Sequence, residues 1–149
     1  MDSTIPEIKL EHADARGEIY SIALPDNREL MLLHSKAGSL RGGHSHSCDE
    51  IVVLLTGKMR YYKRCFNKDN IFVMTPEGLK DLYAEGEPSG NHQGRAMQIQ
   101  SLSINEAGEV HMGEFLEDSW VLEYKFAEKG HWSQEDYEPW RERVRASQG

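Results

Sequence analysis

Cysteine is scarce in this 149-residue chain, which contains only Cys48 and Cys65. Two thiols are too few for a disulfide framework, and we expect both to be free in a reducing compartment. The chain also lacks an apolar run long enough to span a bilayer, and its first residues do not form an apolar leader. These absences argue against a membrane partner and favour a cytoplasmic location.

Positive charge is also in short supply. Lys and Arg number 17 against 25 Asp and Glu, for a net charge of −8. Nucleic acid is therefore excluded as the main partner, because neutralising phosphates needs a broad basic surface. A local exception follows Gly57, where five cations surround Tyr61 and Tyr62: Lys58, Arg60, Lys63, Arg64 and Lys68. They indicate either a solvated strand or a pocket wall that presents cations to an anionic substrate.

The remaining pattern is typical of one all-β domain over residues 1–149, long enough to bury a core. Alternating or continuous apolar residues predict strands at 18–24, 30–34, 51–55, 71–74, 97–104 and 120–126, with a kink or bulge in the fifth. A final helix is expected from about Asp136, with Trp140 and Val144 on one side and Ser133 or Asp136 as the cap. It would pack on the exterior of the β-structure or at a dimer contact.

The most informative segment has the spacing Gly38, five residues, His44-x-His46, three residues, Glu50, six residues, Gly57. In an extended strand, residues i and i+2 point to the same face, so His44 and His46 can share one ion. Glu50 opens an apolar run, where a carboxylate is costly unless it is paired or coordinated. Two imidazoles and a carboxylate suit a divalent transition metal: Fe, Mn, Ni, Co or Zn. The competing interpretation is a pair of histidines on a surface turn.

This segment resembles the first conserved motif of the cupins at every specified position. The resemblance implies a cupin-type antiparallel β-barrel (jelly roll) with a metal pocket inside, followed here by a short C-terminal helix. It also implies a homodimer. The apolar character of both faces at 51–55 agrees with a second sheet or a partner subunit covering that strand.

The cupins have a second motif that supplies another histidine, and two segments resemble it. Residues 76–81 keep a proline and a glycine but place Asp81 where the histidine belongs, whereas residues 106–111 keep the glycine and His111 but have Glu106 in place of the proline. The residues after His111 resemble the strand pair that follows this histidine in sugar-processing cupins. We therefore assign the metal ligands as His44, His46, Glu50 and His111. A histidine that donates to a carbonyl at a strand start is the alternative for His111.

The segments at 14–18, 41–46 and 116–119 resemble cupins that process sugars, sugar phosphates or nucleotide sugars. The resemblance implies an isomerase or epimerase acting on a small sugar or sugar phosphate, with an anionic sugar as a candidate. Proton transfer between adjacent carbons needs a base near the substrate. The candidates are Tyr61, Lys63, His34 and Glu123; packing is the alternative role for the tyrosine and solvation for the charged groups.

Three other functions remain open. Nucleotide-sugar ketoisomerases of the cupin fold have an Arg-Gly-x-His-x-His segment similar to residues 41–46. This resemblance implies a metal-free alternative in which a histidine is the acid or base. The same ligands also suit an iron-dependent dioxygenase, because they leave coordination positions for oxygen and substrate. A non-catalytic ligand-binding module is the third.

The Gly-rich segment at 85–95 contains His92, which either reaches the site or lies in an exposed loop.

Overall fold

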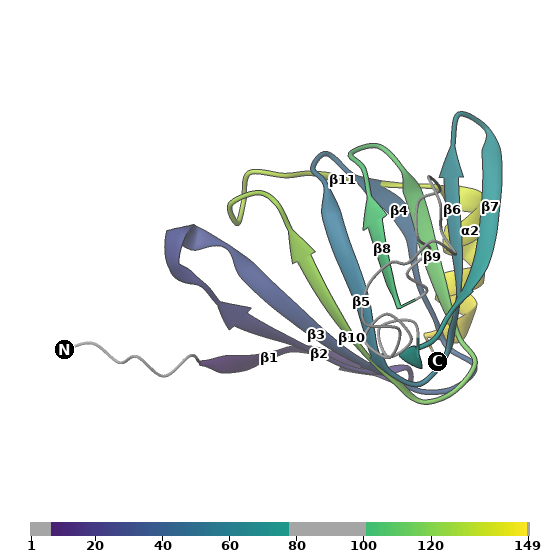
Figure 1. Ribbon diagram of the computed structural model, residues 1–149, viewed down its shortest axis with the longest axis horizontal. Coiled ribbons are helices and arrows are strands. Elements are labelled where there is room, and N and C mark those ends of the chain that lie inside the picture. Colours follow the sequence, from purple (N-terminus) through teal and green to yellow (C-terminus); the bar gives the residue numbers. More distant parts are fainter. Residues whose placement is uncertain (1–6, 78–100, 149) are drawn as a thin grey trace, which may run out of the picture.

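The computed structural model describes residues 7–77 and 101–148, which form two antiparallel β-sheets, a short 3-10 helix at Pro25–Asn27 and one α-helix, α2, at Glu138–Ser147. The six-stranded sheet has the order β1 (Ile8–Asp14), β2 (Gly17–Ala23), β3 (Glu29–Ser35), β10 (Ser119–Lys125), β5 (Glu50–Thr56) and β8 (Leu102–Asn105). The five-stranded sheet has the order β11 (Gln134–Asp136), β4 (Leu40–His46), β9 (Val110–Phe115), β6 (Met59–Cys65) and β7 (Lys68–Met74). Figure 1 shows the strands of the two sheets fanning out from a common lower edge.

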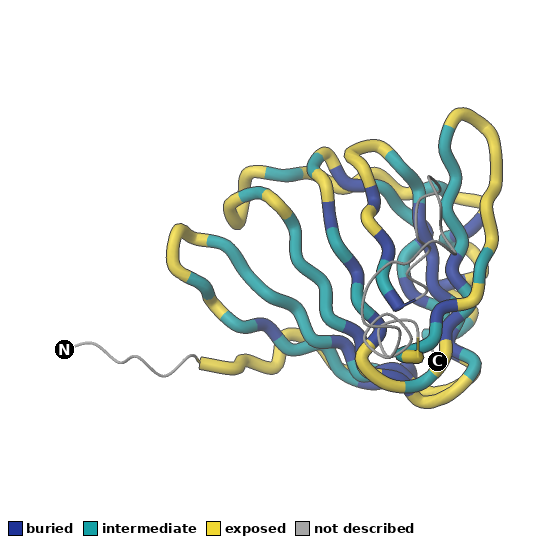
Figure 2. Tube along the Cα trace, viewed as in Figure 1, coloured by how far each residue is buried: buried dark blue, intermediate teal, exposed yellow. Residues whose placement is uncertain are grey.

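Strand alternation sorts the side chains into an interior and an exterior set. On β5, Val52 and Leu54 are buried between the sheets, whereas Leu55 is exposed. On β6, Met59 and Tyr61 are buried together, because residues two apart in a strand share one face. The full buried cluster consists of Leu33, Val52, Leu54, Met59, Tyr61, Met74, Phe115 and Val121. The buried stretches in Figure 2 accordingly alternate with partly exposed ones along the central strands.

Helix α2 covers the outer face of the five-stranded sheet, as expected. Its Trp140 and Val144 are buried against Met112 of β9. The predicted cap is wrong: Tyr137 is the N-cap residue and makes no side-chain capping bond. The residues proposed as caps precede the helix because Gln134–Asp136 pairs with β4 as β11. Asp136 is therefore the last residue of a strand and does not cap the helix.

The fold class predicted from the sequence is confirmed, with one refinement. The described strands are mostly antiparallel and form two facing sheets that are not closed into a continuous barrel. Strand β1 was not predicted. It forms the edge of the six-stranded sheet, and almost all of its residues are exposed. Asp81, His92 and the segment at 85–95 lie outside the described residues. Among the residues described, no helix is long and apolar enough to cross a membrane.

Candidate metal centre and cavity

A cavity of about 300 Å³ lies between the two sheets. Its apolar walls include Leu33, Val52, Phe115 and Val121, all of them core residues. The lining also contains many polar groups: Arg16, Arg41, His44, His46, Tyr61, His111, Glu123, Lys125, Gln134, Arg141 and Gln148. A small apolar cavity with convergent polar groups has the character of a ligand site.

His44 and His46 lie on β4 and face this cavity together. Their ring centroids are 4.7 Å apart, in agreement with the predicted two-residue spacing. The strand before them is irregular, since its register with β9 shifts between Gly42 and His44. Gly42 and Gly43 have φ angles of 98° and 79°, which glycine adopts readily and other residues rarely do. The glycines thus form a bulge inside the strand.

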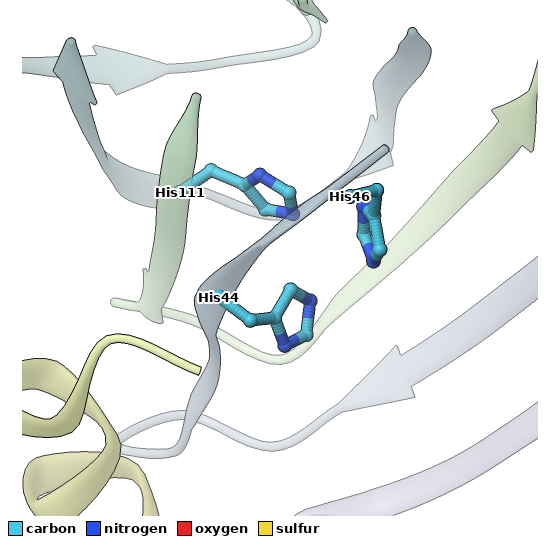
Figure 3. A group of neighbouring side chains, drawn as sticks. All are labelled: His44, His46 and His111. Carbon is cyan, nitrogen blue, oxygen red and sulfur yellow. The ribbon is translucent and has the colours of Figure 1, made fainter. Parts of the chain in front are cut away.

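His111 completes a group of three imidazoles. It lies on β9 directly opposite His44, and paired residues of antiparallel strands project from the same face. Its ring centroid is 5.0 Å from those of both His44 and His46. One candidate ligand atom from each histidine lies within 4.8 Å of those of the other two. Figure 3 shows the rings converging from two neighbouring strands.

The three histidines fit a metal ion. The Nδ1 atoms of His44 and His46 are buried without a hydrogen-bond partner among the described residues. Nδ1 of His111 lies 3.2 Å from the carbonyl oxygen of Glu109, an arrangement that orients the ring and leaves Nε2 for a ligand. Burial lowers the pKa of all three, to about 2 for His44 and about 3 for His46. Neutral imidazoles with free lone pairs are what a divalent transition metal requires.

Glu50 lies beside this group and is 1% exposed. Its Oε1 is 3.3 Å from Nε2 of His111 and 3.8 Å from Nδ1 of His46. Its Oε2 is 3.2 Å from Nζ of Lys125 but outside hydrogen-bonding geometry. A buried carboxylate beside three neutral imidazoles is placed to become the fourth ligand, and it would bind through oxygen.

Asn105 connects Glu50 to Tyr61. Its side-chain nitrogen donates to Oε1 of Glu50 at 3.1 Å and to the phenolic oxygen of Tyr61 at 2.7 Å. Because the tyrosine oxygen accepts this bond, its own proton is available to another acceptor. Burial and the nearby Glu50 raise the pKa of Tyr61 well above its usual value. The phenol is therefore a neutral hydrogen-bond donor at physiological pH.

Glu123 and Lys125 add opposite charges to the cavity wall from β10. Burial and the charge of Glu50 raise the pKa of Glu123 to about 7. For Lys125, burial opposes the charge, but the carboxylates of Glu123 and Glu50 outweigh it and raise the pKa. The Lys125 ammonium also lies 4.6 Å from the ring centroid of Trp132, and the Trp132 and His46 rings are nearly perpendicular with centroids 5.2 Å apart. Glu123 is thus a carboxyl group that exchanges a proton near neutral pH.

The other two candidate bases lie away from the cavity lining. His34 pairs with Glu18 at 3.1 Å and stacks on Trp120, whereas its neighbour Leu33 lines the cavity. Lys63 donates to the carbonyl oxygen of Ile104 at 2.7 Å and pairs with Glu109. These partners hold both side chains outside the described cavity wall.

Sequence reasoning missed Arg16, Arg41 and Lys125 as residues of the cavity lining, and Asn105 as the hydrogen-bond partner of Glu50 and Tyr61. Arg41 was considered only as part of a segment resembling sugar-processing cupins. Lys125 lies two residues after Glu123 on the same strand, and this spacing could have predicted that both side chains share one face. Asn105 had no signal, because it acts through partners on other strands.

No protein-family model matches the sequence, and no curated protein matches it. Solved structures match it in fold. The capsular polysaccharide assembling protein CapF from Staphylococcus aureus is 17% identical with a TM-score of 0.56, over 84% of this chain and 30% of that one. Oxalate decarboxylase from Bacillus subtilis is 16% identical with a TM-score of 0.55, over 91% of this chain and 31% of that one.

A third similar structure is closer in size. KdgF from Halomonas sp. is 11% identical with a TM-score of 0.53, over 81% of this chain and 88% of that one. The chain thus spans about 30% of CapF and of oxalate decarboxylase but most of the length of KdgF. At these identities the likeness concerns the fold, which this chain shares with all three proteins.

Proposed function

We propose that this chain, which has the cupin fold, is a metal-dependent isomerase or epimerase acting on a sugar or sugar phosphate. The observation that carries the proposal is the position of Glu123, whose titratable carboxyl group lines the same cavity as the three histidines. A proton-transfer enzyme needs a base with a pKa near the working pH, next to the group that activates the substrate.

The metal would be held by His44, His46, Glu50 and His111, which are ligands suited to Fe, Mn, Ni, Co or Zn. When bound, such an ion supplies a Lewis acid that polarises a carbonyl or hydroxyl oxygen of the sugar. The choice among these metals is left to elemental analysis, because affinity order and supply override ligand type.

The side chains around the ligands would move the proton. The Glu123 carboxylate takes a proton from a substrate carbon and returns it to the neighbouring carbon. The neutral Tyr61 phenol donates a hydrogen bond to the oxygen on which negative charge develops, since its own oxygen already accepts from Asn105. Lys125 keeps a positive charge beside Glu50 and Glu123 and so limits the rise in the pKa of Glu123.

The sugar class is proposed from the sequence and the fold. It rests on the sequence segments that resemble sugar-processing cupins and on the fold shared with CapF, described as a capsular polysaccharide assembling protein. Since the chain spans 30% of CapF, the activity of that whole protein is not carried over.

Metal content is the first experiment. Elemental analysis of the purified protein should find close to one transition-metal ion per chain, and His44→Ala should lose it. His131→Ala, which changes an exposed histidine, is the matched control and should retain the ion. Equal metal content in the wild type and His44→Ala would overturn the metal centre as described.

Proton exchange is the second experiment. Sugar phosphates incubated with the protein in D₂O should gain deuterium next to the carbonyl group, as followed by NMR. Glu123→Gln should slow the exchange by about 10²- to 10⁴-fold, and the exposed Glu117→Gln should leave it unchanged. Oxygen consumption with bound iron would instead favour the dioxygenase, and ligand binding without turnover would favour the binding module.

We also propose that the protein is a homodimer. Leu55, Trp120 and Ile104 lie on the neighbouring strands β5, β10 and β8 and are 44%, 36% and 55% exposed. They alternate with buried residues, so they lie on the outer face of the six-stranded sheet, where a second copy would cover them. Light scattering should give twice the chain mass. Ile104→Lys should lower it, while Phe66→Lys on the other sheet should not.

A further inference from the structure

We propose that Arg41, with Arg16 beside it, binds an oxyanion group of the substrate in the part of the cavity directed away from the histidines. The inference deepens the proposed function and rests on it in one respect: the ligand is taken to be the substrate of the metal centre. It assigns the substrate class as a small acid, a carboxylate or a phosphate ester.

Arg41 is a buried cation without a carboxylate partner among the described residues. It is 7% exposed and lines the cavity. Its Nε donates to the Ser35 hydroxyl at 2.7 Å, and its Nη2 donates to the carbonyl oxygen of His34 at 3.3 Å. Both acceptors are neutral, and Nη1 has no acceptor in the described part of the chain. Burying a charge is costly unless an opposite charge compensates it, so the site is prepared for an anion.

Arg16 adds a second guanidinium to the same wall. It is 6% exposed, pairs with Asp14 and donates to the carbonyl oxygen of Leu40 at 3.1 Å. Asp14 therefore neutralises one of two buried cations. Burial and the charge of Arg16 lower the pKa of Arg41 to about 10, which leaves it protonated at neutral pH. Arg41 is left as the guanidinium without an ion-pair partner among the described residues.

The position of Arg41 gives the substrate two recognition points. On β10, Lys125 lies opposite Glu50 of the metal centre, whereas Ser119 lies opposite Ser35, the hydrogen-bond partner of Arg41. The Arg41 anchor is thus displaced along the sheet from the histidines. Apolar side chains, including those of Leu33 and Val121, line the cavity as well.

This arrangement suits a short acid whose oxygen atoms approach the histidines while its anionic end pairs with the guanidinium fork, which matches carboxylate and phosphate geometry. A cavity of about 300 Å³ accommodates a ligand of that size.

The anion site replaces the cations predicted from the strand after Gly57. Arg60 pairs with Glu114 at 2.9 Å, and Arg64 pairs with Asp69, so both are already neutralised outside the cavity. Lys63 is paired with Glu109. The cavity-lining cations therefore include Arg41 of β4 and Arg16 of the loop before β2, but none from β6.

The test measures anion binding apart from metal binding. Inorganic phosphate and acetate are titrated by calorimetry into the purified wild type and into His44→Ala, with the Arg41 Nε–H signal of His44→Ala followed by NMR. We expect at least one of the two anions to bind both proteins and to shift the Arg41 signal. Arg41→Gln, in the His44→Ala background, should weaken binding by about ten- to a hundredfold. Preference for phosphate or acetate identifies the source of the oxyanion.

Arg145→Gln in the same background is the matched control, because it removes an exposed arginine of α2 and should leave binding unchanged. Unchanged affinity in Arg41→Gln, or an Arg41 signal that responds to neither anion, overturns the inference. If Arg41→Gln fails to fold, the response of the Arg41 Nε–H signal in His44→Ala to added anion is the deciding measurement. Anion binding at Arg41 in a protein that never binds metal would support this site while the metal-dependent function fails. If the protein binds metal but the Arg41 signal responds to neither anion, the metal centre is supported and the anion site is not.

Discussion

Arg41 and His44 line the same cavity although they are three positions apart on one strand. In a regular strand that spacing would point them to opposite faces. The bulge at Gly42 and Gly43 adds one residue, so that Arg41 pairs with Gly113 and His44 pairs with His111. A guanidinium and the histidine group thereby share one cavity.

The first prediction concerns this bulge. A Cβ atom at residue 42 would lie 2.7 Å from the carbonyl oxygen of His111, at a φ angle of 98°. Gly42→Ala should therefore lower the free energy of unfolding by roughly 2–4 kcal/mol and reduce metal content. Urea denaturation and elemental analysis measure the two effects.

Gly38→Ala is the control for Gly42→Ala. It has a similar φ of 88° but no atom within 4 Å of the added carbon, so it should cost about 1 kcal/mol and retain the metal. Equal losses in the two variants would show that backbone strain alone, without the approach to His111, explains the effect.

The second prediction concerns Asn105, which is 2% exposed and bonds both Glu50 and Tyr61. Asn105→Ala leaves two buried acceptors unsatisfied and should destabilise the fold by about 1–3 kcal/mol. If Glu50 is a ligand, metal affinity should also fall by about ten- to a hundredfold. Ser103→Ala, which removes a donor to Asn105 itself, should have a smaller effect on affinity in a competitive chelator titration. Unchanged affinity in Asn105→Ala would argue against Glu50 as a ligand.

The third prediction is a pH dependence of stability caused by Glu123. Its pKa is about 7 in the folded protein against 4.5 normally, so between these values the folded state keeps a proton that the unfolded state loses. The free energy of unfolding should consequently fall as pH rises through this window, by on the order of 2 kcal/mol, and Glu123→Gln should abolish that fall.

Urea unfolding of the wild type and Glu123→Gln at pH 4.5 and pH 8 tests the sign. The variant should gain stability relative to the wild type at the higher pH, whereas Glu117→Gln should track the wild type throughout. A stability difference that does not change with pH would contradict the raised pKa.

The fourth prediction concerns the support of β4 by α2. Trp140 is 9% exposed and packs with Met112 and Val144 on the outer face of the five-stranded sheet. Trp140→Ala should cost about 3–5 kcal/mol. It should also reduce metal content, because Trp140 anchors the helix whose Arg141 donates to the carbonyl oxygen of Gly42 in the bulge at 2.8 Å. Phe66→Ala, at a residue 97% exposed, should change neither unfolding nor metal content. Full metal content in folded Trp140→Ala would separate the helix from the site.

Much of this molecule could be anticipated from local spacing. Two-residue periodicity was enough to place His44 and His46 on one face, because the side-chain period of a strand does not depend on its partners. The all-β class and the helix packed outside followed from similar patterns. The choice of His111 depended on a family resemblance, and the structure brings it to the other two histidines.

The remaining features of the site depend on the pairing between strands that are far apart in the sequence. Whether His34 or Glu123 faces the cavity depends on which side of the six-stranded sheet meets the other sheet, and apolar residues on both faces of β3 and β10 hide that choice. The bulge that turns Arg41 inward is a register shift against β9, and Asn105 reaches Glu50 because β8 pairs with β5. A linear pattern records which side chains share a face of one strand. Only the tertiary structure decides which strands are neighbours and in what register, because those hydrogen bonds join residues far apart in the chain.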